Sequence, residues 1–287
     1  MKLKYKPIER STLDYIHAKR VNQPYLGYNW HYHEEFELIY FLEGQGIRIV
    51  GDHISDFKQG ELVLVGAWLP HLWRNDAQEA NGNEADFIVI KFRETFGDIH
   101  LFSLPELSKI KKLLKKSHRG LFFSRKVKEQ VHQVILKLVK SQGAEKLILL
   151  LQVLQVLSTE KEFSPLSSPE FKRPVQPLVE DRLQTVINYI FINHHKNISL
   201  EEIAEVAIMT PPAFCRFFKK RTNKTFSHFL NEFRVEKSCQ LLLDNRKPIK
   251  QICYEVGFNS LTNFNRAFKS FKGLTPSTYR KKLRLFQ

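Results

Sequence analysis

The chain has 287 residues, of which 43% are hydrophobic and 26% are charged, and its formal net charge is +15. This length allows two domains with separate cores, and the composition excludes a disordered or fibrous protein. The three cysteines have no disulfide spacing, and the most apolar run, at 147–157, is too short to span a bilayer. The N-terminal segment lacks the apolar core of a signal peptide. We therefore expect a soluble, cytoplasmic protein that makes no membrane contact.

Short strands are predicted in residues 1–93. Aromatic and branched residues gather at 36–42, 47–50, 62–65 and 87–92, with glycine-rich turns between them. Gly51-Asp52 has the form of a two-residue hairpin turn. This pattern is typical of a small barrel or jelly roll.

Four potential metal ligands lie in this segment. His31, His33 and Glu37 have odd numbers on one predicted strand, which would place them on one face, and His71 follows later. Imidazoles and a carboxylate could together bind Zn, Fe, Mn, Ni or Cu. The alternative is that they are hydrogen-bonding residues at a barrel mouth, or relics of a lost site. Trp68 and the other nearby aromatic residues suit either a small-ligand pocket or a core.

The spacing of these residues resembles that of the cupin motifs. The first motif is matched by His31, His33, Glu37 and Gly44, and the second by Gly60, His71 and Asn75. Gly66 and Trp68 stand where cupins usually have Pro and Gly. The resemblance implies a barrel that senses a small-molecule effector, with a pocket near His31, His33, Glu37, Trp68 and His71. No cofactor is required by this reading, and a metal at the three histidines and Glu37 stays an open alternative.

Residues 94–160 are predicted to be helical. Leucine, isoleucine and valine recur at helical spacing in 107–114, 127–138 and 147–157. The last run is apolar over a wide face, which either packs within the chain or meets the same helix of a second subunit. We expect a homodimer that forms through this segment. Serine and proline then cluster in 161–177, which cannot hold a helix and is predicted to be a linker.

Residues 178–287 carry most of the positive charge. They contain 19 Lys and Arg against 9 Asp and Glu, a net charge of +10, whereas the rest of the chain has a net charge of +5. Such a field favours the attraction of phosphate, although a basic surface can also serve solubility alone.

This C-terminal segment also repeats itself. Residues 199–208 align with 248–257 at an offset of 49, and 214–225 align with 264–275 at an offset of 50. The repeat predicts two helix-turn-helix units joined by a long helix at 226–243, with one extra residue in the second turn. Two such units on a rigid helix can enter successive major grooves roughly 34 Å apart.

The outward residues of the second helix in each unit are the candidates for DNA contact. In the helix near 211–221 they are Pro212, Ala213, Cys215, Arg216, Lys219 and Lys220. In the helix near 260–271 they are Thr262, Asn263, Asn265, Arg266 and Lys269. Arginine suits guanine, asparagine suits adenine, and small apolar groups suit the thymine methyl. Lysines, among them Lys224 and Lys272, suit phosphates, and for each polar residue a solvated or intradomain role is the alternative.

The last hundred residues resemble the AraC/XylS family of bacterial transcription regulators. The resemblance rests on Ala204, Phe214, the run at 216–220, Phe226, the run at 252–258, Phe264, Arg266, Phe268-Lys269, Gly273, Thr275-Pro276 and Tyr279-Arg280. Ile208 departs from the pattern, because the family often has Gly in the first turn. The resemblance implies contact with promoter DNA and RNA polymerase, and activation more often than repression.

Together these observations predict a multidomain α+β protein that is not an enzyme. A cupin-like effector barrel at 1–93, a helical dimerisation segment at 94–160 and a linker at 161–177 would precede an all-α domain at 178–287 with two helix-turn-helix units. The expected function is sequence-specific regulation of transcription in response to an effector. Two alternatives stay open: a metal-dependent cupin enzyme fused to a DNA-binding domain, and a regulator whose N-terminal domain is purely structural.

Overall fold

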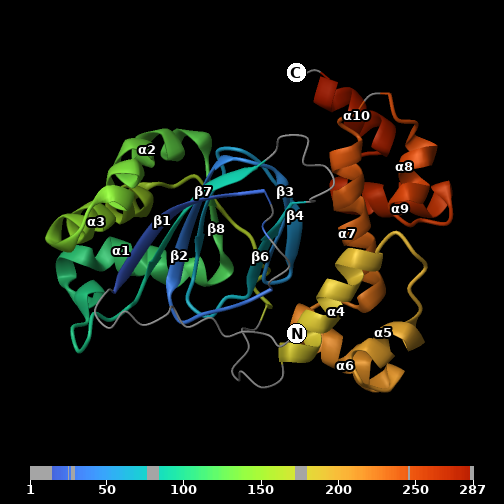
Figure 1. The fold of residues 1–287 in the computed structure, drawn as a ribbon, viewed down its shortest axis with the longest axis horizontal. Coiled ribbons are helices and arrows are strands. Elements are labelled where there is room, and N and C mark those ends of the chain that lie inside the picture. Colours follow the sequence, from blue (N-terminus) through green and yellow to red (C-terminus); the bar gives the residue numbers. More distant parts are fainter. Residues whose placement is uncertain are drawn as a thin grey trace. The chain divides into compact units, whose positions relative to one another are not determined.

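The structure, a computed structural model, describes residues 15–24, 26, 30–75, 84–171, 180–244 and 246–284. The chain divides into two compact units, one formed mainly by residues 4–174 and the other mainly by residues 175–287. Among the described helices, none has both the length and the apolar character that crossing a bilayer would demand. The mixed α+β architecture with a β-rich N-terminal unit and an all-helical C-terminal unit is confirmed (Figure 1).

The N-terminal unit is built from two antiparallel sheets. In chain order its strands are β1 (Ile16–Gln23), β2 (Phe36–Glu43), β3 (Gly46–Val50), β4 (His53–Phe57), β5 (Leu62–Val65), β6 (His71–Arg74), β7 (Ala85–Phe92), β8 (Leu121–Phe123) and β9 (Phe163–Pro165). The larger sheet has the order β1-β7-β2-β5-β8-β9, and the smaller has the order β4-β3-β6.

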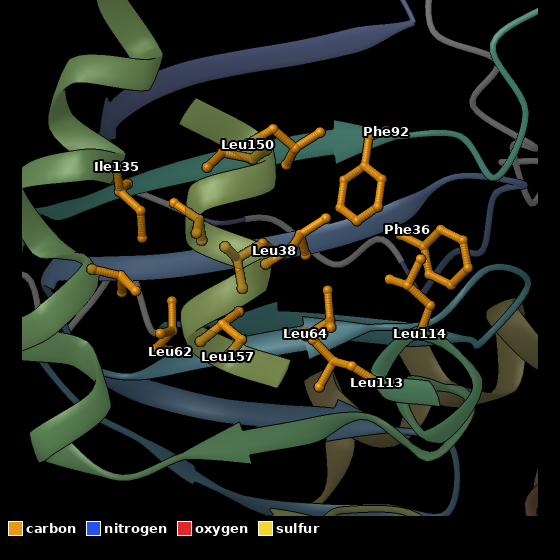
Figure 2. Close-up of a cluster of buried hydrophobic side chains, with 14 of the residues drawn as sticks. Phe36, Leu38, Leu62, Leu64, Phe92, Leu113, Leu114, Ile135, Leu150 and Leu157 are labelled. Carbon is orange, nitrogen blue, oxygen red and sulfur yellow. The ribbon is translucent and has the colours of Figure 1, made fainter. Parts of the chain in front are cut away.

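Alternation along the central strands creates two cores. Leu38 and Tyr40 of β2 face helices, whereas Ile39 and Phe41 face the space between the two sheets. The helices on the outer face are α1 (Ser108–Lys116), α2 (Arg125–Lys140) and α3 (Gly143–Thr159). Figure 2 shows how their leucines and Ile135 meet the side chains of the large sheet. Glu37 alternates with Leu38 on β2 as Ile39 does, and it is therefore directed between the sheets.

The predicted strands at 36–42, 47–50, 62–65 and 87–92 are confirmed as β2, β3, β5 and β7, and Gly51-Asp52 forms the turn before β4. The predicted linker is corrected in its first part. β9 lies within 161–177 and pairs with β8, and the backbone N–H of Ser168 donates to Asp52 at 2.9 Å. The N-terminal unit therefore extends to at least residue 171, while Pro174 and Pro177 lie outside the described residues.

The C-terminal unit contains seven described helices. They are α4 (Glu180–Asn193), α5 (Leu200–Val206), α6 (Pro211–Thr222), α7 (Phe226–Leu241), α8 (Ile249–Glu255), α9 (Leu261–Lys272) and α10 (Pro276–Arg284). α5 and α6 form the first helix-turn-helix unit, and α8 and α9 form the second, with α7 between them (Figure 1).

The internal repeat holds at the level of single hydrogen bonds. In the first turn Met209 N donates to Ala204 O at 2.9 Å, and in the second Phe258 N donates to Cys253 O at 3.0 Å. Ile208 has φ +56° and Gly257 has φ +97° at the equivalent position. Both helices thus end with a left-handed residue that lets the chain reverse. The departure at Ile208 changes the residue but not the turn.

Candidate DNA interface and histidine cluster

The first unit presents one side of α6 to solvent. Thr210 is the residue before the helix, and Pro211 and Pro212 occupy its first positions, where their missing N–H groups cost nothing. Phe214 and Phe218 are fully buried and fix the orientation of the helix. The exposed residues are Pro212, Cys215, Arg216, Lys219 and Lys220, while the predicted outward residue Ala213 is half-buried.

The second unit presents the corresponding side of α9. Phe264 and Phe268 are fully buried, so the opposite side faces solvent. All five predicted outward residues are exposed: Thr262, Asn263, Asn265, Arg266 and Lys269. Arg266 Nη2 donates to Asn263 Oδ1 at 3.2 Å, which holds together two side chains of the types that suit base edges.

Two lysines expected to face phosphate have partners inside the domain. Lys224 forms an ion pair with Glu232, and Lys272 forms one with Glu236 at 2.7 Å. The side chains of both glutamates are largely buried. The expectation of phosphate contact for these two lysines is therefore corrected, because the intradomain partner already takes the ammonium.

The histidine cluster forms in the N-terminal unit, although not for the reason that the spacing suggested. Only Glu37 lies on β2, whereas His31 and His33 precede it, and His31 pairs with His71 through an isolated β-bridge. The backbone bonds of that bridge are 3.1 and 2.9 Å long. The start of β6 therefore brings His71 to the other two histidines. One possible ligand atom from each of the four residues lies within 4.8 Å of the others.

Backbone carbonyls orient two of the imidazoles. Nδ1 of His33 lies 3.0 Å from Glu35 O, and Nδ1 of His71 lies 2.7 Å from Leu69 O. Each carbonyl contact fixes the orientation of its ring and turns Nε2 away from that carbonyl. His33 Nε2 is 2.8 Å from Glu37 Oε2, and His71 Nε2 is 3.6 Å from the same oxygen. Both Nε2 atoms thus point at one carboxylate.

Lys91 was not among the predicted residues, yet it completes the cluster. It is the cross-strand partner of Glu37 on β7, and its Nζ lies 2.9 Å from Glu37 Oε2. Its side chain is 18% exposed. Lys91 interrupts the otherwise apolar run of β7, and the opposite charge of Glu37 stabilises it there.

Burial and neighbouring charges shift the pKa values of His31, His33 and Glu37. Burial, with the neighbouring His71 and His33, holds the pKa of His31 well below its usual value, and burial also lowers that of His33. Burial opposes the charge of Glu37, but the Lys91 ammonium and the hydrogen bond with His33 hold the pKa of its carboxyl well below the usual value. A carboxylate whose pKa is lowered thus lies beside His31 and His33, whose burial disfavours the protonated imidazole.

These residues fit a divalent metal in donor type, because three imidazoles and one carboxylate suit Zn²⁺ and similar ions. Lys91 opposes that fit, since its ammonium already neutralises the carboxylate. Trp68 borders the cluster through its backbone N–H, which donates to His33 O at 2.7 Å. Its side chain is 38% exposed and its φ is +62°. The tryptophan thus keeps a backbone conformation suited to the glycine that cupins usually have there.

Comparisons with known families agree with both halves of this description. A cupin domain model matches residues 23–81, and a helix-turn-helix domain model matches residues 203–282. An uncharacterized HTH-type transcriptional regulator, YdeC of Bacillus subtilis, is 22% identical over 91% of this chain and 89% of its own length. The probable transcriptional regulator LumQ of Photobacterium leiognathi is 31% identical over 34% of this chain and 41% of its own length.

Solved structures give partial matches. The C-terminal domain of AraT, a response regulator from Geobacillus stearothermophilus, is 29% identical, covers 37% of this chain and 88% of its own, and has a TM-score of 0.35. ToxT from Vibrio cholerae is 13% identical, covers 93% of this chain and 97% of its own, and has a TM-score of 0.36.

The fold, the family matches and the duplicated turn define a DNA-binding transcription regulator with an N-terminal cupin domain. Its C-terminal domain contains two helix-turn-helix units.

Proposed function

We propose that the protein recognises a specific double-stranded promoter sequence by placing α6 and α9 in two successive major grooves. The observation that carries this proposal is the equivalent exposure of base-reading and phosphate-binding side chains on both helices. Arg216 and Lys219 of α6 correspond to Arg266 and Lys269 of α9 at an offset of 50, and all four are exposed. Two helix-turn-helix units that expose equivalent side chains suit two major-groove segments on one side of the duplex.

Base readout and phosphate contact are assigned by side-chain chemistry. Arg216, Arg266 and Asn263 carry paired donors or acceptors that match base edges, and Asn265 and Thr262 extend the same face. Pro212, Ala213 and Cys215 offer apolar contact, whereas Lys219, Lys220 and Lys269 serve phosphates.

Selection of bound duplexes from a random pool by the full-length chain tests this proposal. The expected result is a site with two conserved segments whose centres lie about 10 base pairs apart, one helical turn. A single conserved segment, or none, would refute the two-groove reading.

We further propose that the N-terminal unit is the sensory and dimerising part, and that the protein recruits RNA polymerase rather than acting as an enzyme.

The exposed face of α3 supports a dimer, because Ile148 is exposed while Leu150, Val153 and Leu154 of the same helix are buried against the sheet. Light scattering of Ile148→Lys, with the exposed Lys115→Glu on α1 as control, checks this. A wild-type mass equal to the monomer, or an Ile148→Lys mass equal to a wild-type dimer, would contradict it.

A small effector would contact His31, His33, Glu37, Trp68 and His71. For the effector to regulate, it must bind two arrangements of the protein with different affinity. A thermal-shift screen of small molecules detects binding, since a ligand of the native state raises stability. No shift across a broad library would favour a purely structural N-terminal domain.

A divalent metal at the histidine cluster is a second candidate, favoured by the carbonyl contacts that direct Nε2 of His33 and His71 inward. A bound metal would supply a Lewis acid or a fixed charge there. Elemental analysis of purified protein should then give near-stoichiometric metal that is lost in His33→Ala. Metal-free protein of normal stability would exclude this candidate, and turnover of a substrate with bound metal would instead favour the enzyme alternative.

A further inference from the structure

The helix α7 belongs to both helix-turn-helix units at once. In its N-terminal half, Phe229 packs edge-on against Phe218 of α6, with ring centroids 5.4 Å apart. In its C-terminal half, Val235 and Cys239 belong to the core that also contains Phe264 of α9. The two recognition helices keep a fixed spacing only if both halves are held against their neighbours without slipping.

Arg234 lies where these two halves meet and is 7% exposed. Its Nε donates to His194 O at 2.8 Å, and its Nη2 donates to Lys196 O at 2.7 Å. Both carbonyls lie just beyond the end of α4, where the backbone has no helical partner. Burial lowers the pKa of Arg234 to about 10, so the guanidinium is still charged at neutral pH. The side chain therefore fastens α7 to the segment that leads into the first unit.

The turn of the second unit, at Gly257, contacts the same segment after α4. The guanidinium carbon of Arg234 is 5.7 Å from the ring centroid of Phe258. A Cβ at Gly257 would overlap His194 O and would lie 2.9 Å from Arg234 Nε. It would also lie 3.0 Å from His195 Cα. The turn of the second unit thus packs backbone to backbone on the segment that Arg234 holds.

We propose that Arg234 is the positioning residue that sets the distance and angle between the two recognition helices, by clamping residues 194–196 between α7 and the turn at Gly257. This inference rests on the proposed two-groove reading. It assigns specificity for the spacing of the two DNA segments to a side chain that contacts no DNA.

The chemistry of arginine suits this role. Its planar group directs two donors at two carbonyls while its face lies over an aromatic ring, whereas the ammonium of lysine is a compact charge without that fork. Apolar packing alone tolerates sliding better, because it has no preferred direction. Removal of the guanidinium should therefore make the distance and angle between the two units more variable, while each unit keeps its own structure.

The test uses the full-length chain and three duplexes built from the site that the wild-type protein selects from a random pool. The first keeps the selected spacing, the second has one base pair inserted between the two segments, and the third has the second segment scrambled. One inserted base pair rotates the second segment by about 34° and moves it about 3.4 Å along the axis. Affinities are measured by fluorescence anisotropy for the wild type, Arg234→Met, Arg234→Lys and the exposed control Arg246→Met.

The wild type and Arg246→Met should lose about 10-fold or more in affinity on the inserted duplex, because the second segment no longer fits the fixed spacing. Arg234→Met should bind the selected duplex more weakly, yet should differ by less than about 3-fold between the selected and inserted duplexes. Its affinity for the scrambled duplex should match that of the wild type. The discrimination of Arg234→Lys between the selected and inserted duplexes should lie between those of the wild type and Arg234→Met.

An Arg234→Met variant that keeps the wild-type discrimination would overturn the proposal, and so would an equal loss of affinity on all three duplexes, which indicates a folding defect alone. If Arg234→Met does not fold, Gly257→Ala tests the clamp from the opposite side and should relax the spacing in the same way. A wild type that is indifferent to scrambling refutes the two-groove reading itself, and with it this inference.

Discussion

The first helix-turn-helix unit contains a strained residue whose replacement should stabilise the protein. Ile208 has φ +56°, a region that a β-branched side chain rarely adopts. It is also 81% exposed, so its side chain gains little from packing. Gly257 is its counterpart in the second unit. We expect Ile208→Gly to stabilise the C-terminal unit without changing the turn, because the hydrogen bonds of the turn come from the backbone.

The magnitude follows from two opposing effects. The left-handed conformation costs an L-residue about 1–2 kcal/mol, with a β-branched residue at the upper end. Glycine offsets about 0.5–1 kcal/mol of this stabilisation, because a glycine residue loses more conformational entropy than isoleucine when the chain folds. The net stabilisation should be about 1 kcal/mol, which raises the melting temperature of a domain of this size by about 3–6 °C.

Thermal unfolding followed by two probes measures this effect. All three tryptophans, Trp30, Trp68 and Trp73, lie in the N-terminal unit, so their fluorescence monitors that unit, while far-UV ellipticity also monitors the C-terminal helices. Asn223→Gly is the matched control, because Asn223 has φ +58° and asparagine tolerates this region. The control should change stability by less than about 0.5 kcal/mol. An unchanged or lower helical melting temperature in Ile208→Gly would refute the assignment of strain.

Three further predictions concern the two candidate sites. Arg266→Ala should weaken binding to the selected site by about 1–3 kcal/mol and leave binding to random DNA nearly unchanged; equal losses would assign Arg266 to phosphate. Lys219→Ala should lower the slope of log K against log salt by about 1, whereas Lys224→Ala should leave it unchanged, because Lys224 is paired with Glu232. Lys91→Met should raise the affinity of the histidine cluster for Zn²⁺ in isothermal titration, because an ammonium no longer competes for Glu37. Equal zinc affinity in the two proteins would show that Lys91 does not compete.

The sequence predicted the longer buried strands better than the edge strands, and the three-residue interior strand β8 was not predicted. β2, β5 and β7 lie inside the large sheet and read as apolar runs, because both of their faces are covered. β1 and β9 form its edges, and their sequences, IHAKRVNQ and FSP, carry polar residues or proline that hide them from a periodicity search. Edge strands need pairing on one side only, so their residues are less constrained.

The sequence predicted which histidines and which glutamate form the cluster, but not which backbone elements bring them together. The spacing of His31, His33 and Glu37 suggested one strand, but a bridge between His31 and His71 does the joining. Lys91 enters through the register of β2 with β7, which pairs it with Glu37. Register depends on the whole sheet, so no local pattern could have placed that lysine.

The backbone conformation is retained at two positions where the resembling families usually have glycine. Trp68 and Ile208 both stand where glycine is usual, and both keep a positive φ. The backbone path is thus retained although the residue that makes it easy is absent. Each site is held by neighbouring hydrogen bonds, from Trp68 N to His33 O and from Met209 N to Ala204 O.

Net charge predicted the partner of the C-terminal domain but could not say which lysines meet it. Lys219 and Lys224 lie five residues apart and look alike in sequence, yet one is exposed and the other is paired with Glu232 on α7. Lys269 and Lys272 repeat the contrast in the second unit, where Glu236 takes the second lysine. In each unit the later lysine, at or just after the end of the second helix, is paired with a glutamate of α7, and the earlier one is exposed. The domain therefore uses part of its positive charge to hold the geometry that the remaining charge needs, and only the position of the acidic residues on α7 distinguishes the two uses.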